Sequence, residues 1–193
     1  ASGGPQPMIE TERLRLRNWR QGDGEQFREH CNRPNVMRWL GGVRTPEFMD
    51  EVVGRFVAWQ EERGFTFWVV ERKEDCAFLG FCGLKIADGV NSTVAGEIEV
   101  GWRFREDAWG KGYAKEAAIA SLDHAFDKLA APRVVALTVV GNEMSWGLMK
   151  RLGMTLRPEL EYVDLAWPDS MNPTIVYVIT RQEWEGRDAD LRR

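Results

Sequence analysis

Apolar and polar positions alternate along the first part of the chain. In residues 11–19, leucines at every second position are separated by arginines, a period of two that is typical of a β-strand with one solvent-facing side. Asp23 is suited to cap a short helix, which leads into a mobile loop around the Gly41-Gly42 pair. From Pro46 to residue 63, large apolar side chains recur at helical spacing, and Gly64 suits the end of that helix.

The rest of the chain predicts a run of strands followed by alternating helices and strands. Turn-forming residues separate the first strands and favour an antiparallel arrangement. One later strand is apolar on both faces, which indicates a position in the middle of a sheet. The elements predicted after Gly64 are strands over 65–71, 77–86 and 95–104, a helix over 113–129, a central strand over 133–140, a helix over 143–152, and strands around 155–165 and 174–181.

One domain accounts for this length. The 193 residues suffice for one core of ordinary size, and no repeat, low-complexity tract or Pro/Gly linker marks a boundary. We place the domain at residues 8–184 and expect 1–7 and 185–193 to be flexible termini. Because residues 1–7 include two glycines and two prolines, we interpret them partly as an expression scar.

Composition and charge narrow the class of protein. Hydrophobic residues make up 44% of the chain and charged residues 29%, which favours a soluble globular protein. Lys and Arg number 26 against 30 Asp and Glu, and this net charge of -4 argues against a nucleic-acid partner.

Cysteine and histidine usage gives no indication of a metal site. The three cysteines and two histidines lack metal-type spacing, so we expect no metal ion. No apolar run approaches the roughly 18 residues that a membrane span needs. With no leader pattern in this sequence, we expect a reduced, cytoplasmic protein without a membrane partner.

The segment 109–115 combines glycines with the start of a predicted helix. A helix N-terminus presents unpaired N–H groups and partial positive charge, so a phosphate can bind there if the backbone comes close. Gly110 and Gly112 permit that approach, Ala114 keeps the next turn small, and Lys111 and Lys115 add positive charge. A tight turn with solvated lysines is the alternative interpretation.

Two other phosphate-binding motifs do not fit the same residues. A Walker loop needs Gly-x-x-x-x-Gly-Lys followed by Ser or Thr, which the sequence lacks. A dinucleotide fingerprint needs a third glycine where Lys115 stands, together with an opening strand-helix-strand unit. An ATPase and a Rossmann enzyme are therefore both disfavoured.

The order of several motifs resembles the GNAT superfamily of N-acetyltransferases, and within it the ribosomal-protein (RimJ/RimL) type. The resemblance covers most of the chain, and its glycine signature falls on residues 109–114 with Trp109 at the first position. The residues that carry it are Glu10 to Arg17, Asp23, Phe78-Leu79-Gly80, Glu99-Val100-Gly101-Trp102, Trp109 to Ala117, Asn142, Ser145 and Leu152-Gly153-Met154.

The resemblance implies an α/β GNAT fold with acetyl-coenzyme A as cosubstrate. It implies a mixed, mostly antiparallel sheet of about seven strands with about four helices, splayed between the fourth and fifth strands, here 95–104 and 133–140. Acetyl-coenzyme A would lie in that gap, with its pyrophosphate at N–H groups of Gly110, Lys111, Gly112, Tyr113, Ala114 and Lys115. The backbone of Trp102, Arg103 and Phe104 would pair with the pantetheine arm. Asn142 would contact the arm or the acceptor, or would cap the following helix.

Acetyl transfer to an amine requires removal of a proton, and two glutamates are candidates. Glu97 and Glu99 point the same way on a strand and could take the proton directly or through water. We favour Glu99, which matches the family's Glu-x-Gly-aromatic pattern. Solvated acids on a wet strand face are the alternative, and a later acid such as Glu159 or Glu161 would then be the base.

The leaving thiolate needs less help, since a thiol pKa is about 8.5. Many superfamily members place a tyrosine where this chain has Met149, so that general acid is missing. Ser145 is the nearest matching hydroxyl; it would protonate the thiolate or orient water, or would only make a local cap. Trp39, Tyr162 and Trp167 lie where related proteins shape the acceptor pocket and are candidates for stacking on a substrate, although core or surface packing is the favoured interpretation of each.

These observations predict an N-acetyltransferase that moves an acetyl group from acetyl-coenzyme A to a primary amine. The acceptor would be a peptide N-terminus or a small amine, and the protein would be a monomer or a homodimer. A catalytically silent acyl-coenzyme A binding module and an enzyme for small molecules such as aminoglycosides are the alternatives.

Overall fold

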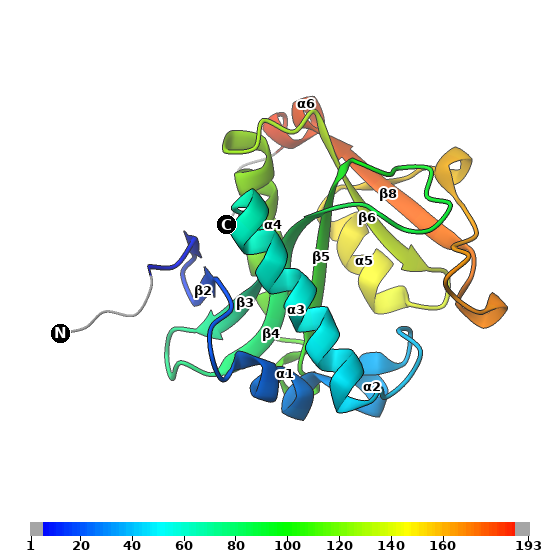
Figure 1. Ribbon diagram of the computed structural model, residues 1–193. Helices are drawn as coiled ribbons and strands as arrows, with labels where there is room; N and C mark the ends of the chain where they lie inside the picture. The colour runs from blue at the N-terminus through cyan, green and yellow to red at the C-terminus, as the bar shows by residue number, and fades with distance from the viewer. Residues whose placement is uncertain (1–5, 188–193) are drawn as a thin grey trace. The chain divides into compact units, whose positions relative to one another are not determined.

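The computed structural model describes residues 6–187, which form eight strands and six α-helices (Figure 1). The sheet is mixed, with strand order β1-β2-β3-β4-β5-β6-β8-β7. The strands are β1 (Ile9–Glu10), β2 (Leu14–Arg17), β3 (Phe67–Arg72), β4 (Phe78–Ile86), β5 (Ile98–Phe104), β6 (Arg133–Val139), β7 (Thr155–Leu156) and β8 (Thr174–Thr180). The helices are α1 (Asp23–Cys31), α2 (Pro34–Met37), α3 (Pro46–Arg63), α4 (Tyr113–Asp127), α5 (Glu143–Arg151) and α6 (Arg181–Glu185).

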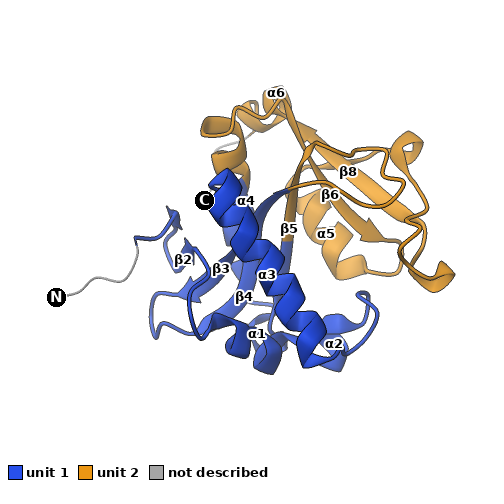
Figure 2. Cartoon of the chain, in the orientation of Figure 1, with its two compact units in different colours: residues 1–85, 102–121 blue, residues 86–101, 122–193 orange. Residues whose placement is uncertain are grey.

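Contacts group the chain into two compact units, which Figure 2 colours separately. Unit 1 consists of residues up to 85 and residues 102–121, and unit 2 of residues 86–101 and 122 onward. Both β5 and α4 contribute residues to each unit. The single domain predicted over 8–184 stays a prediction.

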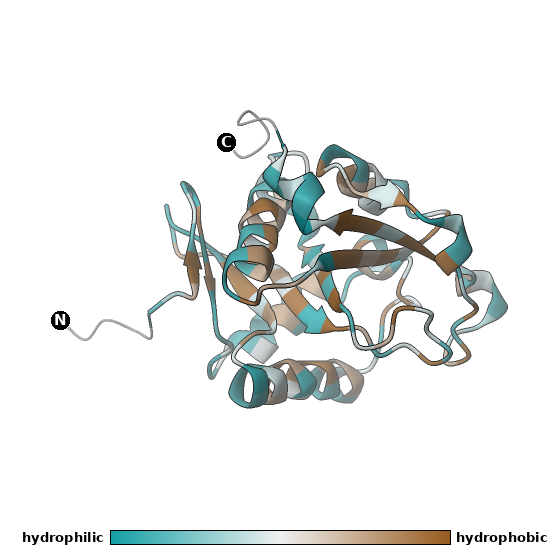
Figure 3. Cartoon of the chain, turned by 90° about the horizontal axis from the view of Figure 1, so that it is seen from above, coloured by the Kyte–Doolittle hydropathy of each residue, from teal (hydrophilic) through white to brown (hydrophobic). Residues whose placement is uncertain are grey.

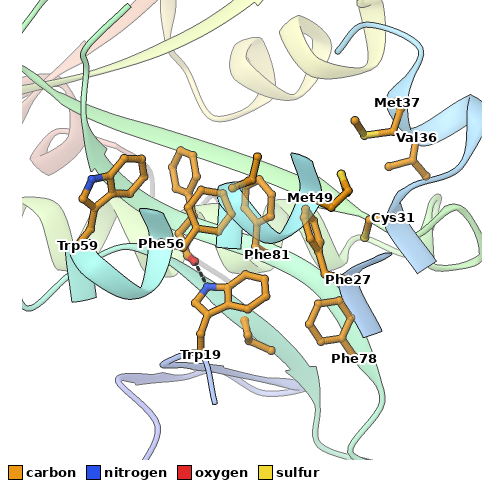
Figure 4. Packing of buried hydrophobic residues seen from close by; sticks show 13 residues of the cluster. Trp19, Phe27, Cys31, Val36, Met37, Met49, Phe56, Trp59, Phe78 and Phe81 are labelled. Carbon is orange, nitrogen blue, oxygen red and sulfur yellow. Dashed lines mark hydrogen bonds between the residues drawn. The ribbon is translucent and has the colours of Figure 1, made fainter. Parts of the chain in front are cut away.

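Unit 1 contains an aromatic core between its helices and strands. Phe56, from α3, lies with its ring centroid 5.0 Å from that of Phe81 on β4 and 5.6 Å from that of Trp19. The Trp19 indole N–H donates to the carbonyl of Phe67 at 2.6 Å, the bond dashed in Figure 4. The aromatic rings bury large areas. Most of the tryptophan and phenylalanine content of the first half of the chain therefore serves packing.

The prediction that the arginines of the first strand face solvent is wrong for Arg17. Its side chain is buried and forms ion pairs with Asp23 at 2.7 Å and Glu71 at 3.4 Å. Burial lowers the pKa of Arg17, but the bonds and charges of the two carboxylates outweigh it and hold that pKa above its usual value. Asp23 is likewise not the N-cap of α1; Gly22 occupies that position in a left-handed conformation. The Asp23 carboxylate is held instead by Arg17 and by the N–H of Arg20.

Unit 2 is organised around β6 and β8, which pair antiparallel over seven residue pairs. Both strands are hydrophobic along most of their length (Figure 3), which confirms the interior strand predicted for residues 133–140. The parallel pairing of β5 with β6 is limited to Ile98 with Val134 and Glu99 with Val135. Because the pairing is confined to the N-terminal ends of both strands, β5 and β6 separate toward their C-terminal ends.

Several predicted elements differ in the structure. The count of about seven strands and four helices is too low, because two-residue strands and short helices leave little periodic signal. The strand predicted around 155–165 is only Thr155–Leu156, followed by a 3-10 turn at Pro158–Leu160 and an isolated bridge at Tyr162. The predicted flexible tail begins too early at Glu185, which still belongs to α6; residues 1–5 and 188–193 lie outside the described residues.

Candidate active site

The loop before α4 has the backbone that phosphate binding needs. Gly110 and Gly112 have φ values of 73° and 80°, in the left-handed region that favours glycine. A side chain at either position would be strained whatever the space around it. The Glu116 N–H donates to the Gly112 carbonyl at 3.0 Å, so the amides before it precede the helical hydrogen-bond pattern. This arrangement fits the pyrophosphate of a nucleotide cosubstrate.

A side-chain clamp from the turn between β1 and β2 holds this loop. The Arg13 guanidinium donates through Nε to the Glu116 carboxylate at 2.7 Å and through Nη1 to the Lys111 carbonyl at 2.9 Å. The Arg13 backbone N–H and the Thr11 hydroxyl donate to the other Glu116 oxygen at 2.9 Å and 2.5 Å. The Arg13 guanidinium also lies 4.3 Å from the ring centroid of Tyr113. We call Thr11, Arg13 and Glu116 the loop clamp.

The electrostatics of the clamp keep Glu116 ionised. Partial burial raises the pKa of Glu116, but hydrogen bonds from Thr11 and Arg13 and the charge of Arg13 outweigh it and leave that pKa below its usual value. A negative charge in the first turn of α4 is also favoured by the helix dipole. In the clamp, the charges of Arg13 and Glu116 therefore neutralise each other, and Arg13 at the same time holds the loop through the Lys111 carbonyl.

The strand segment Trp102–Phe104 is positioned by two neighbours in unit 1. The Trp109 indole N–H donates to the Phe104 carbonyl at 2.9 Å, which ties the first residue of the glycine signature to the end of β5. A Cβ atom at Gly80 on β4 would lie 2.0 Å from the Arg103 carbonyl oxygen. Only glycine permits this approach of the two strands.

The two candidate bases in unit 2 have different surroundings. Both oxygens of Glu97 accept from Arg133, at 2.5 Å and 2.8 Å. This bidentate pair raises the pKa of Arg133 and leaves Glu97 committed to a structural ion pair.

Glu99 lies within electrostatic reach of Tyr162. Burial is the largest cause that raises the pKa of Tyr162, and the negative charges of Glu99 and Asp164 raise it further. The Tyr162 hydroxyl therefore stays protonated at neutral pH. Its ring packs with Ala87, Val94 and the neighbouring β strands in a hydrophobic cluster, which favours packing over a stacking role for that ring.

The remaining predicted residues of unit 2 lie around α5 and the following loop. Asn142 occupies the N-cap position of α5, but its side chain makes no capping hydrogen bond. Ser145 is half-buried in the first turn of α5. Met149 is buried, so the position of the family's tyrosine is filled by an apolar side chain. Trp167 is half-buried, and its carbonyl accepts from the Asn172 side chain at 3.1 Å.

Trp39 and the two loop lysines belong to unit 1. Trp39 is half-buried just after α2, with the guanidinium of Arg38 lying 4.8 Å from its ring centroid. The Lys111 ammonium donates to the Asp107 carbonyl at 3.0 Å, and Lys115 is half-buried in the first turn of α4. The residues that the sequence analysis missed are those of the clamp, because Arg13 and Glu116 are separated by 103 positions and no local pattern joins them.

Two absences hold for residues 6–187. No group of three or more His, Cys, Asp or Glu side chains is placed to hold a metal ion. Within the same range, no helix is both long and apolar enough to cross a membrane.

Together, the mixed sheet and the glycine loop at a helix N-terminus define an α/β protein with a candidate phosphate-binding loop. The chain belongs to the acetyltransferase (GNAT) domain family, whose model matches residues 13–155. It is 33% identical to the uncharacterized protein YkkB of Bacillus subtilis over 145 residues, 75% of this chain and 83% of that protein. It is also 33% identical to the FsC-acetyl coenzyme A-N(2)-transacetylase of Aspergillus fumigatus, over 93% of this chain and 78% of that protein.

A solved structure agrees with this assignment. An acetyltransferase from Agrobacterium tumefaciens superimposes with a TM-score of 0.75 at 26% identity, over 94% of this chain and 98% of that one. The α/β GNAT fold expected from the sequence is therefore confirmed.

Proposed function

We propose that this protein transfers the acetyl group of acetyl-coenzyme A to a primary amine. The observation that carries the proposal is the loop at 110–115, in which two left-handed glycines and the loop clamp present the first amides of α4 to a phosphate. The family to which the chain belongs and the name of its Aspergillus relative agree with this cosubstrate.

The residues of unit 1 would bind and orient the cosubstrate. The amides from Gly110 to Lys115 would hold the pyrophosphate, and the backbone of Trp102–Phe104 would pair with the pantetheine arm. Acetyl-coenzyme A supplies an acetyl group activated as a thioester. The Asn142 side chain makes no capping hydrogen bond, so we assign it to the arm, and the resemblance assigns Ser145 to the leaving sulfur.

Glu99 is the proposed proton acceptor. An amine must lose its proton before it attacks, which near pH 7 costs about 1 kcal/mol for an α-amine and roughly 4 to 5 kcal/mol for a lysine side chain. A carboxylate beside the acceptor both attracts the cation and takes this proton, directly or through water. Glu99 matches the family's Glu-x-Gly-aromatic pattern, and Glu97 is held in an ion pair with Arg133.

For the acceptor we propose a peptide α-amine, as the resemblance to the RimJ/RimL type implies. The putative ribosomal N-acetyltransferase YdaF of Bacillus subtilis, 29% identical over 58% of this chain, lends limited support. A small-molecule amine is the second candidate, and the Aspergillus relative, whose name specifies an N(2)-transacetylase, favours it.

A panel of amines incubated with acetyl-coenzyme A tests the proposal. Thiol release should depend on both substrates, and mass spectrometry should find a product heavier by one acetyl group on a peptide N-terminus or on a small amine. Exhaustive chelation should leave the rate unchanged. Coenzyme A binding without transfer to any acceptor would instead indicate a silent binding module.

A further inference from the structure

We propose that Arg103 is the binding site for a carboxylate carried by one of the two substrates. The inference rests on the proposed acyl transfer, because the segment that holds Arg103 is the one assigned to the pantetheine arm. It adds a chemical requirement that neither the fold nor the family specifies. The substrate class is an amine or an acyl group that bears a second, anionic function.

Arg103 projects from β5 into an apolar part of unit 1. Its guanidinium carbon lies 5.5 Å from the ring centroid of Phe27 and 5.2 Å from that of Phe81. Its Nη1 points to the Met37 sulfur at 3.7 Å, and a thioether is a weak acceptor. Figure 4 shows these three side chains gathered in the core of unit 1.

The guanidinium has no anionic partner within residues 6–187. Among the described residues, no carboxylate contributes to the shift of the Arg103 pKa, and the buried Nε of Arg103 lacks a hydrogen-bond partner. Residue 103 as a whole is half-buried, whereas its Nε is fully buried. Aromatic faces cover the guanidinium and leave the N–H groups at its edge as donors.

Arg17 shows how the same unit treats an arginine that only serves structure. That guanidinium is buried and has two carboxylates, Asp23 and Glu71, within 3.4 Å. The pKa of Arg17 is consequently raised, whereas burial lowers the pKa of Arg103 to about 10. An arginine that is buried without a counter-charge destabilises the protein, so its partner is expected to arrive with a ligand.

The chemistry of the partner follows from the donors and from the other charges of the substrates. The edge of a guanidinium matches the two oxygens of a carboxylate. The pantetheine arm is uncharged, and the phosphates of the cosubstrate are assigned to residues 110–115. A carboxylate at Arg103 must therefore belong to the acceptor or to the acyl group itself.

Two matched pairs of substrates separate these sources. In the first, wild-type protein transfers acetyl from acetyl-coenzyme A to glycylglycine and to glycylglycinamide, whose α-amines are similar. In the second, succinyl-coenzyme A is compared with acetyl-coenzyme A at a fixed amide acceptor. We expect kcat/KM for the carboxylate member of one pair to exceed that of its neutral partner by about tenfold or more.

Arg103→Met is the decisive variant, because an unbranched apolar side chain suits the contacts with Phe27, Phe81 and Met37. It should remove the preference for the carboxylate member, and Arg105→Met, which removes an arginine already paired with Asp107, should keep it. Equal loss on both members of each pair would overturn the proposal, as would a preference that survives in Arg103→Met.

Binding measurements keep the test independent of folding of the variant and of turnover. Calorimetry on wild-type protein saturated with coenzyme A compares the binding of N-acetylglycylglycine with that of its amide. Calorimetry on the ligand-free wild-type protein compares the binding of succinyl-coenzyme A with that of acetyl-coenzyme A. Equal affinities within both pairs would contradict the carboxylate site. Preferential binding of a carboxylate without any transfer would support the site and defeat the proposed acetyltransferase activity.

Discussion

The loop at 110–115 and the acids of unit 2 differ in how firmly the fold fixes the groups that each would use in the proposed function. The loop offers backbone amides, fixed by left-handed glycines and by a side-chain clamp with every charge paired. The acids offer side chains whose roles depend on neighbours: Glu97 is committed to Arg133, while Glu99 acts on the buried Tyr162. In the proposed function, phosphate recognition would thus depend on the backbone, and proton transfer would depend on the surroundings of a side chain.

The largest effect is expected from a substitution that disturbs the backbone of the loop at 110–115. Gly112→Val places a branched residue at a φ of 80° and puts a side chain on the phosphate path, next to Arg13. Coenzyme A affinity should fall by roughly a hundredfold or more, because both the strain and the loss of close approach act together. Calorimetry on the folded variant measures it, and unchanged affinity would remove the phosphate assignment.

The next largest effect is expected from a change at Glu99, the proposed proton acceptor. Glu99→Gln should lower kcat by about a hundredfold near neutral pH and leave coenzyme A affinity nearly unchanged. Raising the pH should restore part of the rate, because more of the amine is then already neutral. A loss that is equal at every pH would mean that Glu99 only positions the cation.

Glu97→Gln is the matched control for that experiment. Removing one partner of the ion pair with Arg133 should affect stability more than the pH-rate profile. A larger kinetic effect at Glu97 than at Glu99 would transfer the role of base two residues upstream. If neither variant changes the profile, a later acid such as Glu159 or Glu161 becomes the candidate.

Weakening the clamp should affect binding of acetyl-coenzyme A more than turnover. Arg13→Gln loses the bridge between the Lys111 carbonyl and Glu116, so KM for acetyl-coenzyme A should rise about tenfold while kcat changes little. S-acetylpantetheine, which lacks the pyrophosphate, should show no such difference. If Arg13→Lys restored the KM fully, positive charge rather than the bridge would be the important property.

The smallest effect is on stability and depends on pH. Because the folded-state pKa of Glu116 is below its usual value, ionised Glu116 stabilises the fold above the unfolded pKa of about 4.3. Glu116→Gln should therefore cost about 1 to 3 kcal/mol at pH 7. In urea titrations the difference from wild type should shrink as the pH falls through the folded pKa; a constant difference would show that charge plays no part.

Local signals explain which elements were predictable. The helix at 46–63 was predicted at both ends because Pro46, helical spacing and Gly64 act within a few residues of each other. Asp23 was misassigned as a helix cap because its carboxylate pairs with Arg17, which lies on the preceding strand and not on the helix. The strand predicted around 155–165 failed because Pro158 interrupts the segment and begins a 3-10 turn there.

The candidate site follows the same rule. The phosphate loop is contiguous in sequence, so its glycines and the following helix could be recognised together. The loop clamp, the Glu97–Arg133 pair and the burial of the Arg103 guanidinium among Phe27, Phe81 and Met37 are created by tertiary contacts between distant segments. Sequence reasoning names the residue types at such positions but cannot assign their partners.

The long sequence separation within the clamp also bears on how the protein matures. Contacts between residues 103 positions apart form only after the intervening chain has been made and its loop-closure entropy overcome. The phosphate loop can therefore coil into the start of α4 early, yet reach its final geometry only when the N-terminal strand arrives. A nucleotide that binds preferentially to the clamped loop would stabilise the fully folded protein. The cell's own pool of that nucleotide would therefore protect the newly made chain from unfolding.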